Sequence, residues 1–144
     1  AGERATRLLR EAEASDPEQQ SDSELHMELG FLEQINGDRV PAKAEYQRAL
    51  NAEPFNETAA SDLAVLDAQS GDAAAAVPLW QAVFQHDPGA SAAGIDLAVA
   101  QCRGESAEAA AKTLRRVLLF APDNDAARKF LLALTAGSQK CAQP

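Results

Sequence analysis

Apolar residues recur every three or four positions along most of the chain, which places them on one face of an α-helix. The apolar stretches come in pairs, and a Gly-Asp break separates the members of a pair at Gly37-Asp38 and Gly71-Asp72, with a similar break at Gly104. One such pair runs through Leu25, Leu29, Leu32 and then Ala42, Tyr46, Ala49 and Leu50. Glycine permits the left-handed turn that ends a helix, and aspartate can cap the next helix. The pattern therefore predicts helical hairpins.

The hairpins repeat with a period of 34 residues, which Pro54, Pro88 and Pro122 mark at the ends of the blocks 23–56, 57–90 and 91–124. Equivalent places hold residues of the same kind. In block order they are Leu29, Leu63 and Leu97; Gly30, Ala64 and Ala98; Ala42, Ala76 and Ala110; Tyr46, Trp80 and Leu114; and Ala49, Val83 and Val117. The small residues let two helices approach closely, and Trp80 should be a buried core residue. A hairpin of this size buries its apolar face only by stacking on its neighbours.

This arrangement resembles the tetratricopeptide repeat family, whose pattern is W-x2-L-G-x2-Y, then A-x3-F, then P. The resemblance covers nearly the whole chain. The opening aromatic place departs from the pattern and holds His26, Ala60 and Gly94; the later tyrosine place departs as well and holds Glu33, Asp67 and Gln101. The resemblance implies an all-α fold without β-sheet, in which antiparallel helix pairs stack into a right-handed superhelical solenoid.

The two ends of the chain have the patterns of half-repeats. Residues 1–17 read as the second helix of an incomplete repeat, through Ala5, Leu9, Ala12 and Pro17. Residues 125–136 read as a first helix, and a polar tail, 137–144, follows. We therefore expect one solenoid domain over 1–144, built from half a repeat, three repeats and the complementary half.

Composition narrows the function. Of 144 residues, 32 are alanine, the best helix former. The net charge of −9 argues against a nucleic-acid binder, which needs a basic face, and no apolar run approaches the roughly 18 residues of a membrane span. No catalytic constellation surrounds His26 or His86, which we expect to be a partly exposed helix residue and a cation in a last helical turn. We expect no enzyme activity, no metal site and no cofactor.

The two cysteines are candidates for a disulfide. By repeat phase, Cys102 lies near the end of the first helix of the third block, and Cys141 lies five residues beyond the next first helix. Packed helices lie roughly 8–10 Å apart and five extended residues reach about 17 Å, so a bond is feasible. It would pin the tail; the alternative is two unrelated thiols.

Two further features concern processing. Ala1-Gly2 is compatible with the site after a signal-peptide cut, and together with the cysteines it favours export to the periplasm or the extracellular space. Asn56-Glu57-Thr58 is a glycosylation sequon at a repeat junction, although such triplets are frequent by chance.

The resemblance implies that the first helices line an inner groove. The groove places are Met27, Phe31 and Gln34; Ser61, Val65 and Ala68; Ile95, Val99 and Cys102; and Lys129 and Ala133. This lining is small and apolar, and it lacks the Lys, Arg and Asn set with which some family members grip a C-terminal carboxylate. We expect a scaffold that binds an apolar helix or tail of a protein partner. The alternative is that part of this surface is packing between helices.

A second hypothesis is a structural subunit that joins copies of itself head to tail into an extracellular filament. Each half-repeat end would expose apolar residues: Leu8, Leu9 and Ala12 at one end, and Phe130, Leu131 and Leu134 at the other. Two ends together would complete a hybrid repeat, and the acidic N-terminal half would attract the basic C-terminal end. The alternative is ordinary solvated helix faces, with the missing half supplied by other sequence.

Overall fold

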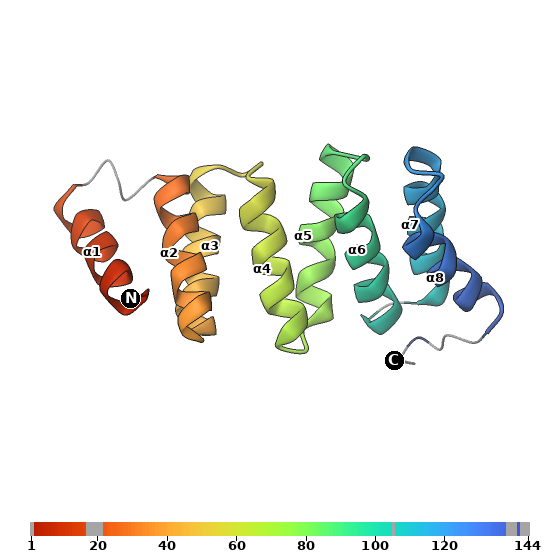
Figure 1. Ribbon diagram of the computed structural model, residues 1–144, viewed down its shortest axis with the longest axis horizontal. Helices are drawn as coiled ribbons and strands as arrows, with labels where there is room; N and C mark the ends of the chain where they lie inside the picture. Colours follow the sequence, from red (N-terminus) through yellow and green to blue (C-terminus); the bar gives the residue numbers. More distant parts are fainter. Residues whose placement is uncertain (1, 17–21, 105, 138–140, 142–144) are drawn as a thin grey trace. The chain divides into compact units, whose positions relative to one another are not determined.

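The computed structural model describes residues 2–16, 22–104, 106–137 and 141. Within these residues every regular element is a helix, which confirms the all-α prediction. The helices are α1 (Gly2–Ser15), α2 (Ser23–Asn36), α3 (Arg39–Ala52), α4 (Glu57–Gln69), α5 (Ala73–His86), α6 (Ser91–Gly104), α7 (Ala107–Phe120) and α8 (Asp125–Thr135) (Figure 1). None of these helices is long and apolar enough to cross a membrane. The chain forms two compact units, which meet in sequence between Leu66 and Asp67.

The turns of the predicted hairpins lie where the sequence places them. Helix α2 ends at Asn36, and Gly37 follows in the left-handed region with a φ of 89°. Gly71 has the same conformation after α4, with a φ of 86°, and α6 ends at Gly104. Asp72 caps α5 by accepting a hydrogen bond from the Ala75 backbone N–H at 3.0 Å. The glycine and aspartate signals therefore locate the helix ends correctly. Asp38 differs from Asp72, because it stands at the cap position of α3 and its side chain makes no capping bond.

The first unit is built on the α2–α3 hairpin, against which α1 packs (Figure 1). Gly30 faces the ring of Tyr46 across this hairpin, and a Cβ at Gly30 would lie only 2.9 Å from the ring carbon Cδ1. Leu29 and Tyr46 are fully buried. The small residue at the eighth place of the repeat therefore sets the close approach of the two helices, as the sequence predicts.

In the second unit each helix from α5 to α8 packs on the next one. Gly94 in α6 lies where α5, α6 and α7 meet, and a Cβ there would come within 2.5 Å of Val117 and 3.0 Å of the Phe84 ring. Trp80 is 5% exposed, which confirms that it belongs to the core. The buried Thr113 hydroxyl donates a hydrogen bond of 2.7 Å to Gln101, so the polar residue at the tyrosine place has a partner.

Candidate functional site

The groove places on α2 form an exposed apolar surface in the first unit. Phe31 is 56% exposed, Met27 and Gln34 are half-buried, and all three lie on one face by their spacing of three and four residues. Ile35, which the groove prediction did not include, extends this surface and is 62% exposed. The Tyr46 hydroxyl donates a hydrogen bond of 2.9 Å to Gln34 Oε1 and so fixes the polar edge of the surface. We call Met27, Phe31, Gln34 and Ile35 the α2 surface.

The groove places on α4 in the first unit, Ser61 and Val65, are half-buried. Between them Asp62 lies beside Tyr46. Burial raises the pKa of the Asp62 carboxyl, although the nearby Tyr46 hydroxyl opposes this. Burial, helped by the nearby Asp62 charge, also raises the pKa of Tyr46. The α4 part of the surface therefore carries a poorly solvated acidic group, which favours a partner with a basic or hydrogen-bond-donating side chain.

In the second unit the groove places differ in exposure. Ile95 and Val99 are half-buried, whereas Lys129 is exposed and pairs with Asp125, its Nζ lying 3.4 Å from Oδ2. Cys102 is buried and forms a disulfide with Cys141, with 4.6 Å between the two Cα atoms. The predicted pairing is therefore present in the structure. Because Cys102 occupies a groove place, Cys141 of the tail covers that place in this unit.

The residues predicted for self-association are only partly exposed. Leu8 on α1 is 53% exposed, and Leu9 and Ala12 are half-buried. On α8, Phe130 and Leu131 are half-buried, but Leu134 is buried in the second unit, where α8 packs on α7, so its predicted exposure is wrong.

The exposed leucine of α8 is Leu132, at 61%. In repeat phase it is equivalent to Gly30, Ala64 and Ala98, which are all buried. A leucine there is too large for the close helix contact that Gly30 makes with Tyr46. The end of α8 therefore differs from the regular repeats at the place where a second helix would pack.

Asn56 of the sequon has a structural role in the first unit. Its Oδ1 accepts a hydrogen bond of 2.9 Å from the Ala59 backbone N–H and so caps α4. Its amide nitrogen, the atom to which a glycan would be attached, donates a hydrogen bond of 2.9 Å to the Ser23 hydroxyl. Glycosylation would have to replace this hydrogen bond.

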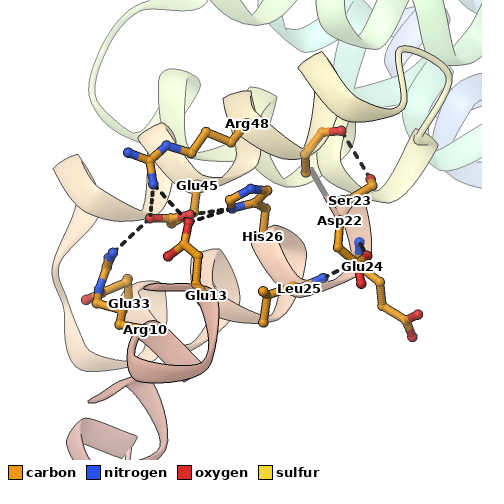
Figure 2. Close-up of polar contacts among 11 residues, drawn as sticks. Arg10, Glu13, Asp22, Ser23, Glu24, Leu25, His26, Glu33, Glu45 and Arg48 are labelled. Atoms are coloured by element: carbon orange, nitrogen blue, oxygen red, sulfur yellow. Dashed lines mark hydrogen bonds and ion pairs between the residues drawn. The ribbon is translucent and has the colours of Figure 1, made fainter. Parts of the chain in front are cut away.

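A cluster of charged side chains lies where α1 docks on α2 and α3 in the first unit (Figure 2). Its members are Arg10 and Glu13 from α1, His26 and Glu33 from α2, and Glu45 and Arg48 from α3. We call these six residues the charged cluster. The expectation that His26 is partly exposed is wrong: the side chain is 1% exposed, and its Nδ1 lies 2.9 Å from Glu45 and 3.7 Å from Glu13. The reason is that α1 covers this place of the repeat.

The two arginines compensate the buried carboxylates of the cluster. Arg10 donates hydrogen bonds of 2.7 Å to Glu33 and 3.0 Å to Glu45, and the bond to Glu33 is the main reason why the pKa of the Arg10 guanidinium is raised. Arg48 lies 3.3 Å from Glu45 and 3.4 Å from Glu13. Among the described residues, Glu13, His26 and Glu45 form the one group whose ligand atoms are close enough together to hold a metal ion. The sequence does contain a signal for this cluster, since His26 and Glu33 stand at two places where the family pattern has aromatic residues.

Comparisons with known proteins agree with this fold. Residues 67–135 match the family model of the tetratricopeptide repeat. No curated protein matches the sequence. Among solved structures, a tetratricopeptide repeat protein from Parabacteroides merdae superposes with a TM-score of 0.83 at 18% identity, over 92% of this chain and 53% of the other. The present chain thus spans about half the length of that relative.

The descriptions of two other similar structures mention peptide binding. YrrB, described as a tetratricopeptide repeat protein with an unusual peptide-binding site, has a TM-score of 0.80 at 17% identity, with 95% of this chain and 69% of YrrB covered. The first tetratricopeptide repeat domain of Spaghetti (RPAP3), bound to an HSP90 peptide, has a TM-score of 0.71 at 19% identity, with 83% of this chain and 94% of that domain covered. Residues 67–135 therefore match the tetratricopeptide repeat family in sequence, and the chain as a whole is similar to proteins of this family in its 34-residue phase, paired helices and buried small residues.

Proposed function

We propose that the chain is a non-enzymatic scaffold that binds a protein or peptide segment through the exposed faces of its first helices. The observation that carries the proposal is the α2 surface. Phe31 and Ile35 are more than half exposed, although both are large and apolar, while Leu29 on the opposite face is fully buried. Large apolar side chains gathered on one exposed face mark interaction sites. Two proteins of similar fold support the same function, since one is described as having a peptide-binding site and the other is bound to a peptide.

The chemistry of the partner follows from the residues around this surface. Met27, Phe31 and Ile35 offer apolar contacts at intervals of four residues, which suit apolar side chains of a helix or an extended tail. The net charge of −9 and the poorly solvated Asp62 favour basic residues beside them. We therefore infer a partner segment that is apolar on one side and basic at its edge.

Selection from a displayed peptide library, followed by fluorescence anisotropy with the selected peptides, tests this proposal. Phe31→Asp and Ile35→Asp should each weaken binding by about tenfold or more, since a buried charge would oppose an apolar contact. Val40→Asp is a matched control, because Val40 is an apolar residue of α3 that is 81% exposed and lies outside the groove places. Equal binding by the wild type and both α2 variants would refute the proposal.

Head-to-tail assembly is the second hypothesis, and the exposure of Leu8 on α1 is the observation that favours it. Leu132 weighs against a regular hybrid repeat, because its side chain fills the place that a close second helix needs. Light scattering after size exclusion distinguishes the two hypotheses. A mass that rises with concentration in the wild type but not in Leu8→Asp supports assembly, and a constant mass of one chain excludes it.

The disulfide is the one observation on which we propose that the protein is exported. Bonds of this kind form and persist in oxidising compartments, and Cys102–Cys141 uses both cysteines of the chain. Fractionation of the native cells, with detection by an antibody to the chain, tests this: protein confined to the cytoplasm with free thiols would contradict it.

A further inference from the structure

Three side chains of the charged cluster are of the types that bind transition metals, and they converge from three different helices. Glu13 comes from α1, His26 from α2 and Glu45 from α3 (Figure 2). Their ligand atoms all lie within 4.8 Å of one another. The side chains of His26 and Glu45 are 1% and 2% exposed, and that of Glu13 is 14% exposed. The group is therefore held by packing and does not depend on flexible surface side chains.

We propose that Glu13, His26 and Glu45 form a binding site for a divalent transition metal such as Zn²⁺. Zinc takes imidazole and carboxylate ligands at about 2.0–2.2 Å in a tetrahedral arrangement, and tetrahedral donor atoms at such distances lie about 3.4 Å apart. The two separations from His26 Nδ1 fall on either side of that value, at 2.9 Å to Glu45 Oε2 and 3.7 Å to Glu13 Oε1. The ligand atoms all lie within 4.8 Å of one another, so the two carboxylates have to turn toward the ion as it binds.

The proton balance at His26 is simple. An ionised Glu45 can only accept a hydrogen bond, so the Nδ1 that faces it carries the proton when no metal is bound. A metal at Nδ1 requires the tautomer with the proton on Nε2. Binding to the neutral ring therefore moves the ring proton from one nitrogen to the other, and the two carboxylates bind in their ionised form.

Charge explains why a cation fits this site. The cluster contains the carboxylates of Glu13, Glu33 and Glu45 and the guanidinium groups of Arg10 and Arg48, so with a neutral His26 it carries one excess negative charge. Arg10 pairs with Glu33 at 2.7 Å and with Glu45 Oε1 at 3.0 Å. Arg48 is the exchangeable cation, because it bridges Glu13 and Glu45 at 3.4 and 3.3 Å while its side chain is 53% exposed. The metal replaces Arg48, whose side chain turns into solvent.

Two consequences distinguish this site from a purely structural ion-pair network. Arg48 and the metal compete for the same two carboxylates, so removing Arg48 should strengthen metal binding. The ligands also join α1 to the α2–α3 hairpin, so the metal should stabilise the fold by an amount that rises with the logarithm of its free concentration above Kd. A network without metal affinity has neither property.

Isothermal titration of the full-length, chelator-treated protein with ZnCl₂ at neutral pH is the direct test. We expect one ion per chain, binding about tenfold or more weaker in Glu13→Gln, and tighter binding in Arg48→Ala. Both cysteines are in the disulfide, so thiolates do not contribute. His86→Ala is the matched control, because it removes the only other histidine, which is exposed and lies outside the cluster. No saturable binding to the wild type, or equal binding by the wild type and Glu13→Gln, would overturn the proposal.

His26→Ala is the stronger variant but it opens a buried site, so its circular dichroism spectrum is compared with that of the wild type first. If it is folded, it should lose binding, and retained binding overturns the proposal. If it is unfolded, X-ray absorption at the zinc edge of the loaded wild type replaces it. A first shell that contains an imidazole nitrogen and carboxylate oxygens supports the site, and a shell of oxygen alone refutes it.

Discussion

Replacing Glu45 by alanine should destabilise the protein by about 2–4 kcal/mol. The Glu45 side chain is 2% exposed and accepts hydrogen bonds from His26 at 2.9 Å and from Arg10 at 3.0 Å. A hydrogen bond to a charged group contributes about 1.5–3 kcal/mol, and this value applies to the bond with His26, which is buried as well. The pairs with Arg10 and Arg48 contribute only about 0–1 kcal/mol each, because their side chains are 39% and 53% exposed and solvent screens them.

Urea unfolding in metal-free buffer measures this effect. Circular dichroism reports the helices of both units, whereas Trp80, the only tryptophan, lies in the second unit and its fluorescence reports that unit alone. Circular dichroism and Trp80 fluorescence should shift together if residues 1–144 unfold as one domain. If only circular dichroism shifts, the two units unfold separately and the expected single domain is wrong. Glu28→Ala is the control, because Glu28 is exposed on α2 and should change the stability by less than about 0.5 kcal/mol.

A loss below about 1 kcal/mol for Glu45→Ala would refute the reasoning. It would mean that the desolvation of the charged cluster cancels its attractions, as happens for many buried ion pairs. The double variant Glu45→Ala with Arg10→Ala separates the attraction between these two residues from the cost of their desolvation. If the two residues interact favourably, the double variant is less destabilised than the sum of the single variants.

Three other predictions test the core, the tail and the acidic groove residue. Trp80→Ala should cost about 3–5 kcal/mol in urea unfolding, because the side chain is 5% exposed, and a loss under about 1 kcal/mol would mean that the repeat phase is wrong. Unreduced protein should show no free thiol in a thiol titration, and two titratable thiols would contradict this. Cys102 and Cys141 are 39 residues apart, so reduction of their disulfide should lower the free energy of unfolding by roughly 3–4.7 kcal/mol in the chain-entropy model. Burial raises the pKa of Asp62 above 3.8, so the contribution of this group to stability is greatest below that pH and is lost as the pH rises through the folded-state pKa. Asp62→Asn should therefore melt at a slightly higher temperature than the wild type at pH 7 and at the same temperature at pH 3. Equal melting temperatures of the variant and the wild type at both pH values would contradict this.

The repeat phase predicted most of the fold because close packing leaves little choice at a few places. Gly30 stands where a Cβ would collide with Tyr46 of the partner helix, and Gly37 and Gly71 stand where the backbone turns left-handed. These requirements are local in each hairpin, so they can be recognised from residue type and spacing alone. The disulfide was predictable for the same reason, since the phase fixes where Cys102 lies on its helix.

The charged cluster could not be derived in this way. Its residues come from three helices, and repeat phase does not indicate which side chains of α1 face the first block, because the junction before Ser23 is longer than the others. The departures at His26 and Glu33 are visible in the sequence, but a departure from the family pattern does not by itself indicate which side chains will contact these residues. A buried polar residue needs a partner. Two such residues in one block were therefore a signal that another element with complementary charge covers them.

This cluster also determines where α1 can dock. The equivalents of His26, Glu33 and Glu45 are Ala60, Asp67 and Leu79 in the second block, and Gly94, Gln101 and Thr113 in the third. Arg10 and Glu13 of α1 would find no comparable set of partners there. Burying these two charges unpaired would cost more free energy than the burial of their apolar neighbours gains. The apolar places recur in every block and would allow α1 to pack on any of them, whereas the complete set of charged places occurs in the first block alone, because the second block keeps only Asp67. Apolar periodicity therefore accounts for the stacking of the repeats, and the polar exceptions to it account for the position of α1.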